Sequence, residues 1–98
     1  MNFNERCYTV LRKVPKGKVT TYKEIARILN SKGYRAVGNA MNKNPYAPEV
    51  PCHRVVCSSG HVGGFAHGTK KKSEMLKKEG IIITKGKIDL KKYMHELK

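Results

Sequence analysis

Two short helical patterns with a four-residue break between them constrain the fold of this chain more than any other feature. Apolar side chains recur at helical spacing over 22–30 and again over 34–42. The break, Asn30-Ser31-Lys32-Gly33, has the polar and glycine residues that end a helix. Thr21 and Glu24 have the spacing of a capping box, which predicts the start of the first helix. Two such helices in close succession indicate a helix-turn-helix.

The rest of the chain predicts further helices and short extended segments around this pair. Helices are expected over 3–13, 69–79 and 89–97, the second of them ending at Gly80. A short extended stretch is expected at Val19-Thr20, and 81–84 with 87–89 should form a small wing around Lys85-Gly86. We therefore expect one domain over residues 1–98, mainly α with short β segments, of the small winged helix-turn-helix type with three core helices.

The charge of the chain favours a polyanionic partner. Lys and Arg total 21 of the 98 residues against 7 Asp and Glu, which gives a formal net charge of +14. Nucleic acid is the leading partner and an acidic membrane surface comes second. No apolar run approaches the roughly 20 residues of a membrane span, and the N-terminus lacks the apolar region of a signal peptide. We expect a cytoplasmic protein associated with DNA and no membrane partner.

Cys52, beside His53, is the group most suited to covalent chemistry. Three cysteines without a secretory signal indicate reduced thiols, and Cys7 and Cys57 are interpreted as small buried apolar residues. A free thiol is only a few per cent thiolate at neutral pH, so a nucleophile needs a base. His53 would act through a water or a bent backbone, and a carboxylate such as Glu79 would hold its ring.

Other interpretations of these residues stay open on spacing alone. Cys52, His53, Cys57 and His61 could bind zinc, although the usual pairs of cysteines two to four residues apart are missing. Cys52 and Cys57 could form a disulfide, or Cys52 and His53 could serve a hydrolase. The helix over 34–42 is also open to two interpretations. Its small residues favour close helix packing, or a slim helix that lies in a groove with Arg35 at its start.

Several motifs together resemble the O6-alkylguanine-DNA alkyltransferases. They are the segments Asn44-Pro45, Pro51-Cys52-His53-Arg54-Val55-Val56, Ser58-Ser59-Gly60 and Val62-Gly63-Gly64, with the helix that holds Tyr22, Glu24 and Ala26, the segment Arg35-Ala36-Val37-Gly38, and Glu79-Gly80. The resemblance covers about residues 5–80, which is close to the whole C-terminal domain of the family. It implies a chain without the family's N-terminal domain.

The resemblance implies how DNA is bound. The second helix of the pair enters the minor groove with Ala36 and Gly38, and Arg35 intercalates where the target guanine leaves the stack. Tyr22 crowds the 3′ phosphate and donates to guanine N3. The partner is double-stranded DNA that contains O6-alkylguanine, and we expect a monomer.

The resemblance also implies the reaction. Glu79 orients His53, which deprotonates Cys52 through a water, and the thiolate takes the alkyl group once per molecule without a metal or cofactor. Asn44 holds the turn before the cysteine.

The base pocket is where the chain departs from the family. The carbonyls of Cys52 and Val55 are expected to recognise the exocyclic amine of the flipped base. The segment 65–67 replaces the family's Tyr-Ser-Gly with Phe-Ala-His. Phe65 is still expected to line the alkyl pocket, and the Ala66 amide to donate to guanine O6. The lost hydroxyl is expected either to weaken stabilisation of the leaving group or to alter the tolerance of bulky alkyl groups.

Two functions of other classes compete with alkyl transfer. A non-catalytic lesion-binding protein of the alkyltransferase-like kind would flip the base and recruit another repair pathway. Such proteins typically have Trp in place of the reactive Cys, whereas this chain has no Trp and keeps Cys52, His53 and Glu79. A sequence-specific regulator is disfavoured, because a helix face of Ala and Gly has few groups that read base edges.

Overall fold

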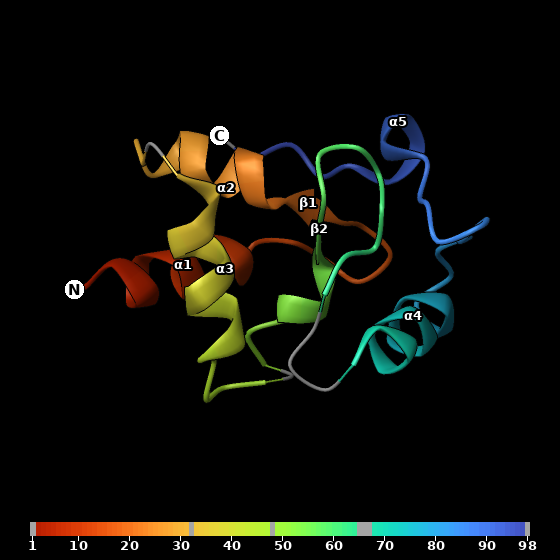
Figure 1. The fold of residues 1–98 in the computed structure, drawn as a ribbon, viewed down its shortest axis with the longest axis horizontal. Helices are drawn as coiled ribbons and strands as arrows, with labels where there is room; N and C mark the ends of the chain where they lie inside the picture. The colour runs from red at the N-terminus through yellow and green to blue at the C-terminus, as the bar shows by residue number, and fades with distance from the viewer. Residues whose placement is uncertain (1, 32, 48, 65–67, 98) are drawn as a thin grey trace.

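The computed structural model describes residues 2–31, 33–47, 49–64 and 68–97. Its regular elements, in chain order, are α1 (Phe3–Leu11), β1 (Thr20–Thr21), α2 (Tyr22–Ile28), α3 (Tyr34–Asn42), the 3₁₀ helix η1 (Cys52–Arg54), β2 (Val55–Val56), α4 (Thr69–Lys78) and α5 (Leu90–Tyr93). Helices α1, α2 and α3 gather on one side of the two strands, and α4 lies on the other (Figure 1). The expected fold class, mainly helical with short β segments, is confirmed.

The helix-turn-helix forms as the sequence indicates. Asn2 caps α1 and Thr21 caps α2, each accepting a hydrogen bond from a backbone amide of the first turn. The Glu24 carboxylate is bound by Arg27, one turn further along α2. Asn30, at φ +58°, turns the chain out of α2. Helix α3 then packs on α1, where the buried Tyr8 hydroxyl donates to the Ala40 carbonyl over 2.7 Å.

A two-stranded parallel sheet separates two apolar cores. Strand β1 pairs with β2 in the register Thr20 with Val55 and Thr21 with Val56. Successive side chains of a strand point to opposite faces. Val55 therefore packs into the core of α1, α2 and α3, while Val56 packs with Leu76 of α4 into the second core. Because η1 directly precedes β2, residues 52–54 lie where the two cores meet.

The sequence overestimates several helix lengths and the wing. Helix α1 ends at Leu11 rather than 13, α2 ends at Ile28 rather than 30, and the last helix spans Leu90–Tyr93 rather than 89–97. The expected wing is reduced to one bridge, between Thr84 and Lys87. Its second side pairs instead with the turn after β2, where the Ile88 amide donates to the Gly60 carbonyl and the Val62 amide donates to the Gly86 carbonyl. Burial of Ile88 in the second core accounts for this pairing.

Candidate active site around Cys52

Cys52 is held at the start of a tight turn by backbone bonds on both sides. Its amide donates to the Val50 carbonyl, and its own carbonyl accepts from the Val55 amide. Asn44 closes the preceding loop, because its side chain donates to the Val50 carbonyl over 2.8 Å and accepts from the Tyr46 amide over 2.9 Å. The prolines in that loop have no amide hydrogen to give. Cys52 is 6 % exposed as a result.

His53 and Glu79, 26 residues apart, are in direct contact. The Nε2 atom of His53 lies 2.9 Å from Oε2 of Glu79, the residue that ends α4. Arg54 donates to the same carboxylate from Nε over 2.9 Å and from Nη2 over 2.7 Å. Its third nitrogen, Nη1, donates to the Val14 carbonyl. Arg54 thereby ties the end of α4 to the segment after α1. The structure thus brings together the two residues that the sequence assigned to one group.

The charges of this group favour a neutral imidazole. Burial lowers the pKa of His53 and outweighs the opposing effect of Glu79, while the positive charges of Arg54 and Lys72 lower it further. Burial alone would raise the pKa of Glu79, but the hydrogen bonds from Arg54 and His53 outweigh it and lower that pKa. An ionised Glu79 can only accept, so Nε2 of His53 carries the hydrogen. Nδ1 is then the ring nitrogen that can take up a proton.

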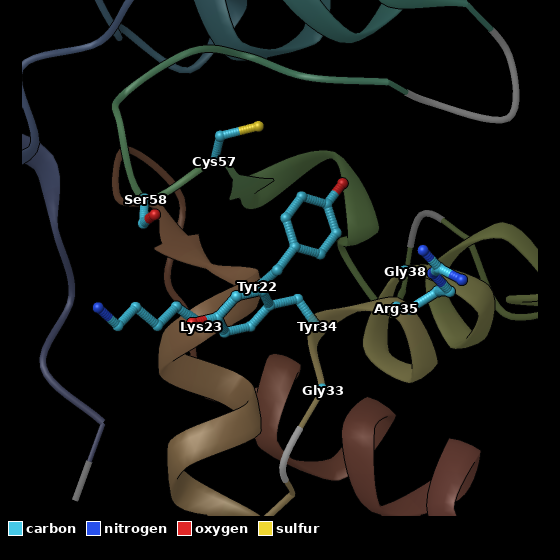
Figure 2. Close-up of a pocket in the computed structure, with 8 residues that line it drawn as sticks. All are labelled: Tyr22, Lys23, Gly33, Tyr34, Arg35, Gly38, Cys57 and Ser58. Atoms are coloured by element: carbon cyan, nitrogen blue, oxygen red, sulfur yellow. The ribbon is translucent and has the colours of Figure 1, made fainter.

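A pocket of about 610 Å³ opens between the first turns of α2 and α3 and the chain after β2. Three of the residues predicted to bind substrate or DNA, Tyr22, Arg35 and Gly38, line it together with Cys57. Among the described residues, the lining does not include Cys52, Ala36 or Val55, so the pocket does not bring all predicted site residues together. Figure 2 shows the ring of Tyr22 over this opening, with Arg35 on one flank. Burial raises the pKa of Tyr22 to about 12, with the nearby thiols adding to the shift, so its hydroxyl keeps its proton.

The outer face of α3 consists of small residues, with the cationic Arg35 at its start. Arg35 and Ala36 are exposed and Gly38 is half-buried, while Val37 and Ala40 are buried. A Cβ added to Gly38 would meet no atom within 4 Å, so no neighbour requires a glycine there. The packing interpretation therefore applies at Ala40, and the groove interpretation stays a prediction for the outer face. Ala40 allows close packing on α1, and Ala36 with Gly38 leaves a smooth outer surface beside Arg35.

Sequence reasoning missed Lys72, which is completely buried and interacts with the thiols of Cys57 and Cys52. Its Nζ donates to the Gly64 carbonyl over 3.1 Å and lies 5.7 Å from the centre of the Tyr22 ring. Burial lowers its pKa to about 8, although the nearby Cys57 and Cys52 thiols act in the opposite direction. A signal was present in the sequence, because Lys72 precedes the apolar Leu76 by one helical turn and shares its face.

The two other cysteines differ from each other. Cys7 is buried in the first core, where burial raises the pKa of its thiol to about 11, which agrees with its interpretation as an apolar residue. The same interpretation of Cys57 is wrong, because its side chain is half-buried and lines the pocket. Gly63, at φ +80°, passes so close that a Cβ there would lie 3.0 Å from the Cys57 sulfur. Close packing of that loop leaves one side of Cys57 facing the opening.

Some predicted site residues lie outside the described residues. Phe65 and Ala66 are among them, so their expected contacts with the alkyl group and with O6 are not placed. Cys7, Cys52 and Cys57 are free thiols. Within the described ranges, no three His, Cys, Asp or Glu side chains are grouped as ligands of one metal ion. None of the helices in that part of the chain is long and apolar enough to cross a bilayer.

The fold and the site together define a basic helix-turn-helix domain with a His53-Glu79 pair next to Cys52 in the chain and a pocket flanked by Arg35. Residues 2–81 match the family described as 6-O-methylguanine DNA methyltransferase, DNA binding domain. The match covers most of the chain, and the chain belongs to this family. The resemblance drawn from the sequence motifs is confirmed.

Several known methyltransferases are similar to this chain over about half of their own length. A methylated-DNA--protein-cysteine methyltransferase of Sulfolobus acidocaldarius is 45 % identical over 82 residues, which are 84 % of this chain and 52 % of the relative. The chain spans about half the length of the curated relatives that it matches. The O6-methylguanine-DNA methyltransferase of Pyrococcus kodakaraensis is similar in structure, with a TM-score of 0.75 and 41 % identity over 83 % of this chain and 47 % of that one.

A second solved structure matches over nearly its whole length. It is Schizosaccharomyces pombe Atl1 in complex with damaged DNA containing O6-carboxymethylguanine, with a TM-score of 0.86 and 32 % identity. The match covers 96 % of this chain and 94 % of that one. The family and the fold are therefore secure, and relatives of this fold include a protein bound to alkylated DNA.

Proposed function

We propose that this protein repairs duplex DNA by moving an alkyl group from O6 of a guanine to Cys52, once per molecule. The observation that carries the proposal is the contact between His53 and Glu79 next to Cys52 in the chain. A neutral, oriented imidazole beside a cysteine is what activation of a thiol requires. The homologues named as cysteine methyltransferases support the same reaction.

Binding begins with the charge of the whole domain. A net charge of +14 draws the protein to phosphates without regard to sequence. The smooth outer face of α3 enters the minor groove, and Arg35 at its start fills the space that the damaged guanine leaves. Extrusion of a base costs a few kcal/mol, and a damaged pair lowers that cost. Tyr22 faces the opening with a protonated hydroxyl that can donate to guanine N3.

Transfer is an in-line displacement at the alkyl carbon. His53 takes the thiol proton of Cys52 at Nδ1 through an intervening water, while Glu79 holds Nε2. The thiolate sulfur forms a bond to the alkyl carbon, and the bond between that carbon and O6 breaks with its electron pair on the base. The proton lost by the thiol is matched by the one the guanine gains. The thioether is stable, so Cys52 is not regenerated. The reaction needs no metal or cofactor.

The nearby ammonium of Lys72 adds to the stability of the thiolate. It is buried, and interaction with the Cys57 and Cys52 thiols raises its pKa against the larger lowering by burial. Charge interactions are stronger in a buried site than in water. Asn44 supports the reaction indirectly, because its two hydrogen bonds fix the loop that leads to Cys52.

Lesion binding without transfer is the second candidate. The observation that favours it is the Atl1 structure, which corresponds to this chain over nearly the full length of both. In that function the protein would extrude the alkylated guanine and hold it for another repair pathway. The Cys-His-Glu group would then serve packing alone.

One experiment separates the two candidates. The protein is mixed with a duplex that holds a single O6-methylguanine, and the mass of the intact protein is measured. A gain of one CH₂ per molecule supports transfer. An unchanged mass together with preferential binding of the damaged duplex supports lesion binding. An unchanged mass without such preference contradicts both.

A further inference from the structure

Tyr34 is an aromatic side chain that the reaction described above does not use. It is the first residue of α3, it is 55 % exposed, and it directly precedes Arg35. Tyr46, also exposed, packs on Tyr8 and donates to Glu5. Within the described residues, the Tyr34 hydroxyl has no comparable hydrogen bond.

The position of Tyr34 relates it to the proposed DNA site. Its ring lines the same pocket as Tyr22 and Arg35, and Gly33 beside it leaves open space. Figure 2 shows both tyrosine rings at this opening, with Lys23 extending to one side and Arg35 lying on the other. The opening therefore combines two flat apolar faces with two flanking cations. A planar base attached to a phosphate has the matching chemistry.

We infer that Tyr34 is a specificity-determining residue that stacks on a base of the duplex step opened by Arg35. The inference rests on the proposed function, because it needs a step from which a guanine has been extruded. In an intact duplex each base is already stacked on its neighbours, so the ring gains little. In an opened step an exposed base face becomes available. Tyr34 thereby adds affinity for damaged DNA in preference to intact DNA.

Removal of the ring tests this selectivity. Stacking of one base on an aromatic side chain is lost on substitution by alanine, which corresponds to roughly a 5- to 150-fold loss of affinity. In a Cys52→Ala background, which cannot remove the methyl group, we expect Tyr34→Ala to show that loss on a duplex with one O6-methylguanine and less than about a twofold change on the intact duplex. Tyr34→Phe should keep the affinity of the original protein. Ile82→Ala, a change at another exposed apolar residue far from the pocket in the chain, is the matched control.

A fluorescent variant tests the contact directly. The chain has no Trp, so Tyr34→Trp introduces a single tryptophan whose emission is quenched when it stacks on a base. We expect strong quenching by the O6-methylguanine duplex and weak quenching by the intact duplex. Ile82→Trp reports quenching that comes from binding alone. Equal quenching of the two reporters, or of Tyr34→Trp by both duplexes, would overturn the inference.

The mass of each protein after mixing separates this inference from the proposed function. If the original protein gains a methyl group and Tyr34→Ala keeps full preference for damaged DNA, the role of Tyr34 is wrong and the proposed function stands. If the original protein neither gains mass nor prefers the damaged duplex, the proposed function fails and the inference fails with it. Gain of mass with lost preference in Tyr34→Ala supports both.

Discussion

The side chain of Glu79 lies 2.9 Å from the imidazole of His53, although the two residues are 26 positions apart in the chain. The side chains are only 4 % and 11 % exposed, so water competes little for the contact. The same carboxylate binds Arg54 and fixes the end of α4 against η1. One acidic residue therefore serves the geometry of the site and the packing of the second core.

Glu79→Gln should lower both the rate of transfer and the stability. Loss of an oriented base lowers a rate by about 10²- to 10⁴-fold, and we expect a loss of at least 10²-fold. A partner removed from a buried ion pair leaves Arg54 without its counter-charge, which costs about 3 kcal/mol of unfolding free energy. Rapid-quench transfer assays and urea unfolding measure the two effects. Glu74→Gln, on the exposed face of the same helix, should change neither, and equal effects of the two variants would contradict the role of Glu79.

Acid should destabilise the protein through His53 and Glu79 together. The pKa of His53 is below its usual 6.5 in the folded state and that of Glu79 is below its usual 4.5. The unfolded chain therefore binds more protons than the folded one in these ranges, and stability falls as the pH falls. The contribution of His53 to the free energy of unfolding is complete above pH 6.5 and is lost as the pH falls through its lower folded pKa. The Glu79 contribution is complete above 4.5 and is lost as the pH falls through its lower folded pKa.

Urea unfolding at a series of pH values checks this expectation. The loss below pH 6.5 should be smaller in His53→Gln, and the loss below 4.5 should be smaller in Glu79→Gln. Unchanged acid profiles in both variants would show that other groups control the stability.

Lys72→Met should make the protein more stable at neutral pH. The pKa of Lys72 falls from 10.5 to about 8 on folding, so burial of the ammonium costs about 3 kcal/mol. Between pH 8 and 10.5 the unfolded chain binds more protons, and the stability of the unmodified protein rises with pH there. That rise should shrink in Lys72→Met. Thermal unfolding at pH 7 and pH 10 measures it.

The matched control for this change is Lys71→Met, at the exposed neighbouring position. It should leave the stability profile unchanged. We also expect Lys72→Met to transfer more slowly, because the thiolate of Cys52 loses a nearby positive charge. Greater stability with an undiminished rate would refute the electrostatic role of Lys72.

Arg35→Ala should affect damaged DNA more than intact DNA. A side chain that fills the space of an extruded base acts only when the step is open, whereas contacts with phosphates act on every duplex. In a Cys52→Ala background, which leaves the lesion in place, affinity for the O6-methylguanine duplex should fall about tenfold or more. The salt dependence of the affinity should decrease by no more than the loss of one phosphate contact. Lys43→Ala, at the other end of α3, should weaken binding to both duplexes alike. Equal losses in Arg35→Ala would remove the role proposed for Arg35.

Local signals in the sequence were enough to predict most of the fold. The capping residue Thr21, the polar break after α2 and Gly80 after α4 act within one turn of chain, so they can be recognised without knowing the tertiary structure. The wing could not be predicted in this way. Its second side pairs with the turn at Gly60, and that choice depends on burial of Ile88 in a core formed by distant residues.

The site residues likewise fall into those that local sequence signals predict and those that depend on the tertiary fold. The motif around Cys52 predicted the cysteine and histidine, and the position of Glu79 at the end of α4 predicted its partner. The buried ammonium of Lys72 and the half-exposed thiol of Cys57 were missed. Their environments come from the loop at Gly63, which brings three separate segments within contact. The helical spacing of Lys72 and Leu76 was a local signal for burial of Lys72, whereas the approach of the three segments depends on the tertiary fold.

The location of the transferred methyl group tests the central claim most directly. Trypsin cleaves after Lys43 and Arg54, which places Cys52 and Cys57 on different peptides. After reaction with an O6-methylguanine duplex, the peptide 44–54 should gain one CH₂ unit, at one per protein molecule, and Cys57→Ser should react in the same way. A methyl group on the peptide that contains Cys57, or on neither peptide, would contradict the account.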